Sequence, residues 1–154
     1  MSKSETGIKV IPPLIFLAAF IVAFAVDWLW PLGFGLPLAL RWILGIVLIA
    51  GPIAVASSLF AAFRRTDSAY DVRKVPKALV TEGAFRYSRN PGYLGLIVLA
   101  VGVAILFDNP WVLLAIVPAA AITHYQVILK EEAVLEREFG DAYRQYKNRV
   151  RRWI

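Results

Sequence analysis

The chain has 154 residues, of which 59% are hydrophobic, and its formal net charge is +6. An apolar share of about 45–50% is usual for soluble domains, so one soluble core of this size could not bury this much apolar surface. A bilayer solvates such surface instead. The chain has no cysteine, which excludes disulfides and thiolate metal sites, and we expect no metal centre. Because basic residues flank the hydrophobic stretches, the charge indicates contact with anionic lipid headgroups rather than with nucleic acid.

Four stretches have the composition of transmembrane helices, which need about 20 mainly apolar residues. They cover residues 11–30, 38–63, 91–107 and 111–129. Pro12 and Pro13 suit the first turn of the first helix, where a missing N–H costs nothing. Asp108-Asn109-Pro110 predicts a tight turn that makes the third and fourth helices antiparallel neighbours. The sequence therefore predicts an all-α polytopic membrane protein with about four transmembrane helices, in which residues 1–154 form a single membrane domain.

The basic residues predict the orientation of these helices. All of the 17 Lys and Arg residues except Arg41 precede the first span, separate the second from the third, or follow the fourth. The positive-inside rule places these segments, and with them both termini, in the cytoplasm. The outer turns near residues 32–37 and 108–110 are short. Polar chemistry is therefore expected from the segment 64–90, the inner end of the fourth helix and the tail.

Residues 130–154 are predicted to form a cytoplasmic tail with a helix, a break and a second helix. Residues 131–139 are helical by composition, Gly140 is a natural stop, and Asp141 suits the start of a new helix. One face of the second helix is apolar or aromatic, with Tyr143, Tyr146, Val150 and Trp153. Such a helix lies in the membrane interface or packs over the inner mouth of the bundle.

His124 is the candidate for chemistry inside a span, about 9 Å from its cytoplasmic end at 1.5 Å per residue. An ionisable group at that depth indicates function, because its burial is costly unless it faces a polar cavity. A histidine satisfied by a neighbouring helix is the alternative. Glu131 follows two helical turns later on nearly the same face, beside Glu132. We expect a polar stripe, with His124 pointing into the bundle close to the segment 89–93, although paired acids are also typical of a solvated helix end.

A second candidate group precedes the third span. Arg86 and Arg89 are three residues apart and can bind a carboxylate or a phosphate in bidentate fashion. Asn90-Pro91 opens the third helix, whose first N–H groups favour anions. The alternative is a basic juxtamembrane loop that contacts lipid headgroups.

Together these two stretches resemble the signature of the isoprenylcysteine carboxyl methyltransferase and phospholipid methyltransferase superfamily. The first stretch is the run from Leu79 to Gly95. The second comprises His124, Glu131-Glu132, Leu135, Phe139-Gly140, Tyr143, Tyr146, Val150 and Arg152-Trp153-Ile154. The resemblance covers about half of the chain, from residue 79 to the end, in the same order and spacing. The first two spans match only in being apolar.

The resemblance implies an S-adenosylmethionine-dependent methyltransferase whose cofactor is bound at the cytoplasmic side by the last two helices and the tail. The cofactor-binding residues that follow from it are Arg89, Asn90, Tyr93, His124, Glu131, Glu132 and Tyr143. In this scheme Arg89 or a tail arginine binds the carboxylate of the cofactor, and Glu131 or Glu132 binds its ammonium. Tyrosine rings line the adenosine or face the cation. Eukaryotic relatives usually have Arg-His-Pro where this chain has Arg89-Asn90-Pro91, and Asn90 cannot titrate near neutral pH.

The acceptor stays open at this point, as a lipid or another amphipathic small molecule. A carboxylate acceptor needs an arginine such as Arg86 to orient it, whereas an ammonium must first lose a proton to a base such as His124 or a glutamate. Arg86 and His124 are therefore the candidate catalytic residues. Two other functions are considered: a nicotinamide-dependent membrane reductase of the sterol-reductase kind, and a non-catalytic membrane scaffold.

Overall fold

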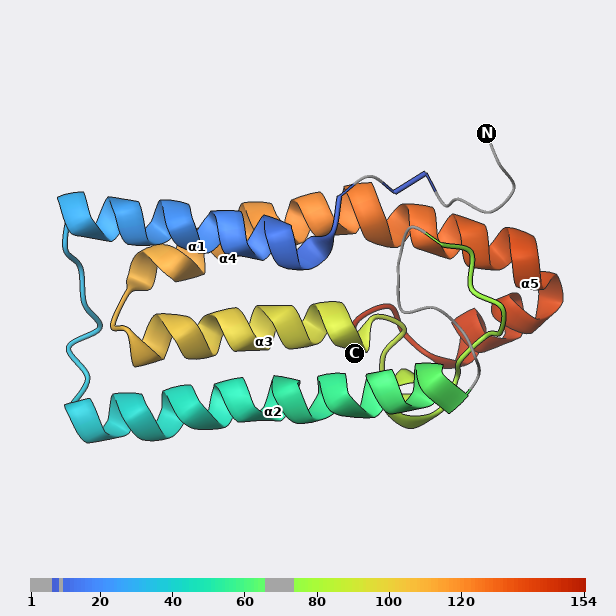
Figure 1. The fold of residues 1–154 in the computed structure, drawn as a ribbon, viewed down its shortest axis with the longest axis horizontal. Helices are drawn as coiled ribbons and strands as arrows, with labels where there is room; N and C mark the ends of the chain where they lie inside the picture. The colour runs from blue at the N-terminus through green and yellow to red at the C-terminus, as the bar shows by residue number, and fades with distance from the viewer. Residues whose placement is uncertain (1–6, 9, 66–73) are drawn as a thin grey trace.

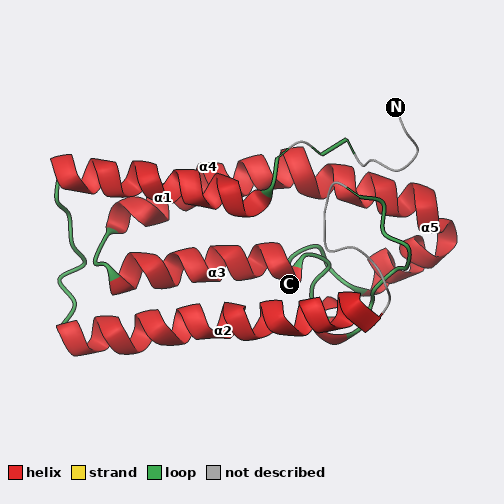
Figure 2. Cartoon of the chain, in the orientation of Figure 1, coloured by secondary structure: helices red, strands yellow, loops and turns green. Residues whose placement is uncertain are grey.

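The computed structural model describes residues 7, 8, 10–65 and 74–154. Lys3, Lys9 and Arg73, three of the basic residues behind the predicted topology, lie outside the described residues. The regular elements of the described chain are helical (Figure 2), which confirms the all-α prediction. They are α1 (Pro12–Leu29), α2 (Leu38–Arg65), the 3₁₀ turn η1 (Gly83–Arg86), α3 (Pro91–Leu106), α4 (Pro110–Thr123), the π-helical turn η2 (His124–Ile128) and α5 (Leu129–Arg149).

The helix starts follow the sequence signals. Prolines occupy the first positions of α1, α3 and α4, where the fixed φ and the missing N–H suit a first turn. The fourth helix differs from its prediction, because it does not end near Leu129 but continues through η2 into α5. The break comes at Gly140, whose φ of 50° and ψ of −120° are not helical. The tail therefore has the predicted helix–break–helix form, with its first half continuous with the fourth span.

Three helices are long and apolar enough to cross a membrane, namely Pro12–Leu29, Leu38–Arg64 and the continuous helix Pro110–Arg149, whose charged end follows the apolar stretch. The fourth apolar helix, α3, has 16 residues, which at 1.5 Å per residue is about 24 Å. The chain is therefore an integral membrane protein.

The four long helices run alongside one another (Figure 1). Helix α3 lies between α2 and the pair formed by α1 and α4. The connections after α1 and after α3 lie at one end of this bundle. The described residues just before α1, residues 74–90 before α3, α5 and the C-terminus all lie at the other end.

Small residues allow the close approach of α3 to its neighbours. Ala100 and Ala104 of α3 are fully buried against α1 and α4. On the other side of α3, a Cβ built on Gly102 would lie 2.9 Å from Ile49 Cγ1 and 3.0 Å from Leu48 Cβ of α2. Lipid gives helices no hydrophobic reason to associate, so this tight van der Waals packing contributes directly to the stability of the bundle.

Asp108 joins the two turns that the sequence predicts on the outer side. Its carboxylate pairs with Arg41 Nη1 at 3.2 Å and accepts a hydrogen bond of 2.9 Å from the backbone N–H of Phe34. Asp108 has a φ of 56°, a left-handed conformation that Asp tolerates better than most residues. Arg41, the one basic residue predicted on the outer side, therefore has a structural partner there.

Candidate functional site

A cavity of about 520 Å³ lies at the end of the bundle that carries α5 and the segment before α3. Its walls come from the second half of α2, the first half of α3, the start of α1, residues 74–85 and α5. On the α2 side the lining is apolar, with Pro52, Ile53, Val55, Ala56, Leu59, Phe60 and Phe63. Most of the polar side chains of the lining come from the start of α3, the residues before it and α5, where apolar residues such as Leu96, Leu99 and Leu135 accompany them: Arg89, Asn90, Tyr93, Glu131, Glu132, Tyr143 and Tyr146. The cavity is therefore amphipathic, as a site for a molecule with one charged end must be.

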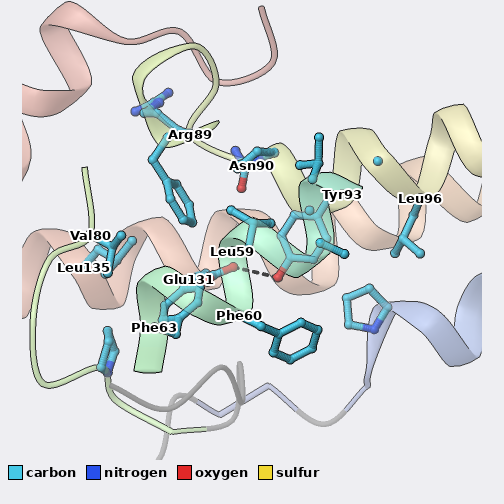
Figure 3. Close-up of a pocket in the computed structure, with 18 of the residues that line it drawn as sticks. Leu59, Phe60, Phe63, Val80, Arg89, Asn90, Tyr93, Leu96, Glu131 and Leu135 are labelled. Carbon is cyan, nitrogen blue, oxygen red and sulfur yellow. Dashed lines mark hydrogen bonds between the residues drawn. The ribbon is translucent and has the colours of Figure 1, made fainter. Parts of the chain in front are cut away.

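Glu131 and Tyr93 meet across the cavity wall (Figure 3). The Tyr93 hydroxyl, in the first turn of α3, donates a hydrogen bond of 2.8 Å to Glu131 Oε2 on α5. Burial raises the pKa of the Glu131 carboxyl, the bond from Tyr93 opposes that rise, and the neighbouring Glu132 adds to it. The ion pairs of the described residues do not include Glu131. Its carboxylate is therefore available to a cation that enters the cavity.

Glu132, by contrast, is neutralised by two arginines. Arg152 donates from Nε to Oε1 at 2.9 Å and from Nη2 to Oε2 at 2.8 Å. Arg89 Nη2 also approaches Oε1, at 3.2 Å, and the side chains of Arg89 and Glu132 are only 8% and 9% exposed. Charges buried to this extent need such partners, because an unpaired buried charge strongly destabilises a protein. The two adjacent acids therefore have different surroundings.

Three hydrogen-bond donors of the polar wall, on two residues, have no partner in the described chain. Arg89 Nε and Nη1 and the Tyr143 hydroxyl are buried and find no hydrogen-bond partner among the described residues. Burial raises the pKa of Tyr143 well above its usual range, so its hydroxyl keeps its proton and can donate. Buried donors left without an acceptor destabilise a protein, and here they lie in the wall of a cavity. An anionic group bound there would satisfy them.

The C-terminal segment, residues 150–153, lies across the segment before α3 and is called the C-terminal strap. The Arg89 backbone N–H donates to the Arg151 carbonyl at 3.0 Å, and Asn90 Nδ2 donates to the Arg152 carbonyl at 3.0 Å. Nearby, the Tyr146 hydroxyl donates to the Phe85 carbonyl at 2.8 Å. These bonds hold Arg89 and Asn90 against the tail.

His124 and Arg86 lie outside the lining of the cavity. The His124 ring is edge-on to Tyr125 and stacks on Trp153, with centroids 6.2 Å apart and an interplanar angle of 27°. The sequence predicts that His124 and Glu131 form a polar stripe on nearly the same face of the helix. The structure differs, because the π-helical turn η2 begins at His124. A π turn holds one residue more than an α turn, and one residue is worth about 100° of rotation. Glu131 is thus turned away from the face of His124 and toward Tyr93.

The structure gathers most of the predicted binding residues at one cavity. Arg89, Asn90, Tyr93, Glu131, Glu132 and Tyr143 line it, whereas His124 and Arg86 do not, and the Arg86 side chain is exposed. Sequence reasoning missed the wall formed by α2, because the apolar residues of that span carry no mark that separates a lipid-facing side chain from a cavity-facing one. It also left the role of Arg152 open among the tail arginines.

Comparison with known proteins gives one family match. The family model for phospholipid methyltransferase matches residues 40–142, which is more than half of the chain and includes most of α2. The chain is 38% identical over 72 residues to a protein-S-isoprenylcysteine O-methyltransferase of Schizosaccharomyces pombe, covering 47% of this chain and 30% of that protein. A protein of the same name from Dictyostelium discoideum is 28% identical over 113 residues, 73% of this chain and 48% of that protein.

A third relative, protein-S-isoprenylcysteine O-methyltransferase B of Arabidopsis thaliana, is 30% identical over 107 residues, 68% of this chain and 53% of that protein. The chain thus spans from about a third to about a half of the length of these methyltransferases. The match from residue 40 extends the likeness beyond the stretches singled out in the sequence, and it brings in the helix that forms the apolar wall of the cavity.

Proposed function

Since the chain belongs to the phospholipid methyltransferase family, we propose that it transfers a methyl group from S-adenosylmethionine to a lipid or another amphipathic acceptor. The observation that carries this proposal is the amphipathic cavity. Its polar residues offer donors without an acceptor and a carboxylate without a cationic partner among the described residues, and the lining from α2 is apolar. A soluble methyl donor and a membrane-borne acceptor require these two environments side by side.

The residues at the polar wall fit the charges of S-adenosylmethionine. Arg89 and Tyr143 would hold its carboxylate, because their buried N–H and O–H donors have no acceptor among the described residues. Glu131 would hold its ammonium, since its carboxylate has a hydroxyl partner but no cationic one in the described chain. When bound, the cofactor supplies a methyl group on a sulfonium centre. Asn90 and Glu132 support the site by holding the tail and by fixing the arginines.

The work left to the protein is to align the reacting groups and to exclude water. Alignment alone can supply roughly 7–11 kcal/mol of a reaction barrier. Tyr93 fixes Glu131 through its hydrogen bond, and the apolar residues of α2 would hold the hydrocarbon part of the acceptor. For His124 we propose a positioning role through its stack on Trp153. For Arg86, which is exposed, we propose contact with headgroups at the membrane surface.

We further propose that both termini face the cytoplasm, so that the cavity opens on the side where S-adenosylmethionine is made. The distribution of basic residues supports this orientation, since Arg41 is alone at the outer end, where it pairs with Asp108. A reporter fused after Ile154 should be accessible only from the cytoplasm. Accessibility from the outside alone would contradict the orientation and leave the cavity on the wrong side for its donor.

Equilibrium binding to the detergent-purified protein tests the proposed ligand. Radiolabelled S-adenosylmethionine should bind, and unlabelled S-adenosylmethionine should displace it while a reduced nicotinamide nucleotide should not. The variant Arg89→Gln should weaken binding at least about tenfold, the scale of a hydrogen bond to a charged group. Retention of the nicotinamide nucleotide instead would favour a reductase, and retention of neither would favour a scaffold.

A further inference from the structure

We infer that Arg152 is a positioning residue, which keeps Arg89 available to the anionic end of the bound ligand by occupying the carboxylate of Glu132. The inference rests on the proposed function, in which that anionic end is the carboxylate of S-adenosylmethionine. Arg152 acts through Glu132 and Arg89, because its own side chain is not part of the cavity lining.

The geometry at Glu132 shows how Arg152 limits the hydrogen bonds that Arg89 can make to this carboxylate. Arg152 binds the carboxylate with both prongs of its guanidinium, at 2.9 Å on Oε1 and 2.8 Å on Oε2. This bidentate arrangement is the strongest that an arginine and a carboxylate can make. Arg89 is left with one longer approach, from Nη2 to Oε1 at 3.2 Å.

The consequence appears in the remaining donors of Arg89. Its Nε and Nη1 are buried and without a hydrogen-bond partner among the described residues, although the Glu132 carboxylate is within reach of the same guanidinium. An unhindered Arg89 would satisfy these donors by turning its own fork onto Glu132. Because Arg152 already holds both oxygens, Arg89 keeps its donors for another acceptor.

Without the Arg152 side chain, this balance changes. Glu132 becomes a buried carboxylate with a single cationic neighbour, and a buried charge that loses a partner recruits the one that remains. Arg89 would then form the bidentate pair with Glu132 and withdraw its donors from the cavity. Binding of an anionic group should weaken, even though no residue of the cavity wall has been altered.

The backbone of the C-terminal strap does not depend on this side chain. The Arg151 carbonyl accepts from the Arg89 N–H, and the Arg152 carbonyl accepts from Asn90 Nδ2. Substitution of Arg152 therefore leaves these bonds in place. Arg151 offers a matched control, because it is the adjacent arginine on the same strap and its side chain is exposed.

The test compares two ligands on the full-length purified protein. S-adenosylmethionine carries the carboxylate, whereas 5′-methylthioadenosine keeps the adenosine and the sulfur but lacks the amino-acid end. Arg152→Gln should raise the dissociation constant for S-adenosylmethionine at least about tenfold and change that for 5′-methylthioadenosine less than about twofold. Arg151→Gln should change neither.

An equal loss of affinity for both ligands would mean that Arg152 only stabilises the fold. Unchanged affinity for S-adenosylmethionine would mean that Arg89 binds the anionic end without Arg152. Either result overturns the inference. If the unchanged protein does not bind S-adenosylmethionine at all, the proposed function itself has failed. Should Arg152→Gln not fold, Arg152→Lys carries the same test, because one ammonium cannot make the two parallel N–H···O bonds of the guanidinium to Glu132. This variant should weaken the binding of S-adenosylmethionine selectively. An equal loss of affinity for both ligands again overturns the inference.

Discussion

The hydroxyl of Tyr93 and the carboxylate of Glu131 are 2.8 Å apart, and their hydrogen bond joins the start of α3 to the start of α5. Thirty-eight positions separate these residues in the chain. The bond fixes one carboxylate in the cavity wall without neutralising it. The adjacent Glu132 is instead neutralised by Arg89 and Arg152. From this contrast we predict that the two acids behave differently on substitution.

Substitution of Glu131 or Glu132 by Gln should distinguish an effect on ligand binding from an effect on the stability of the fold. Glu131→Gln should weaken S-adenosylmethionine binding about tenfold or more, since the ammonium loses its charged partner, while the unfolding temperature stays within error. Glu132→Gln should leave the buried Arg89 and the partly exposed Arg152 without their counter-ion, and breaking such a buried pair costs about 3–5 kcal/mol of stability. Binding isotherms and thermal unfolding in the same detergent measure both. The assignment fails if Glu131→Gln binds as well as the unchanged protein.

Removal of the Tyr93 hydroxyl should shift the pH dependence of binding. Burial raises the pKa of Glu131, so as pH falls this carboxyl protonates, and ammonium binding is lost, at a higher pH than for an ordinary glutamate. The Tyr93 bond stabilises the ionised form. Tyr93→Phe should therefore raise the pKa further and move the acid limb of the binding curve to higher pH. Dissociation constants measured from acid to neutral pH would reveal this; an unmoved limb would show that another group controls it.

Substitution of His124 decides between positioning and catalysis. His124→Phe keeps an aromatic ring that can stack on Trp153 but removes any proton transfer. We expect cofactor affinity and turnover within about threefold of the unchanged protein, well short of the 10²–10⁴-fold effect of a lost general base. His124→Ala, which removes the stack, is the contrasting variant and should weaken binding. A collapse of turnover in His124→Phe with unchanged affinity would restore His124 as a catalytic base.

The close approach of α2 and α3 predicts a stability effect at Gly102. A methyl group there would lie 2.9 Å from Ile49 Cγ1 and 3.1 Å from the Leu48 carbonyl carbon, so Gly102→Ala should destabilise the bundle by about 1–3 kcal/mol. Gly51→Ala is the matched control, because a Cβ at Gly51 meets nothing within 4 Å. Thermal unfolding of the two variants should differ in this sense. Equal unfolding temperatures would mean that the helices separate readily to accept the methyl group.

Much of the fold could be predicted from the sequence, because its signals are local. The apolar stretches gave four helices, prolines marked three of the helix starts, and Gly140 marked the break in α5. The tight turn before Pro110 made α3 and α4 neighbours. The resemblance to the family's motifs also indicated the residues of the polar wall, because their charged and hydroxyl side chains are recognisable in the sequence as binding groups.

Other parts of the site were not predictable, because they depend on tertiary geometry. Nothing in the letters His124–Ile128 marks a π turn, yet that turn decides which way Glu131 faces. The pairing of Arg152 with Glu132 requires the chain to reverse at Gly140 and return across the segment before α3. A tail with several arginines does not reveal which one returns. The apolar wall on α2 has no sequence mark at all.

Methyl transfer itself tests the central claim most directly. The full-length protein, reconstituted in vesicles made from total membrane lipids, is incubated with S-adenosylmethionine labelled in its methyl group, and radioactivity is counted in the organic extract. We predict label in the lipid fraction, reduced at least about tenfold by Arg89→Gln and unchanged by Arg151→Gln. No label above that of empty vesicles, with acceptors of both carboxylate and amine type supplied, would contradict the claim that this cavity carries out methyl transfer.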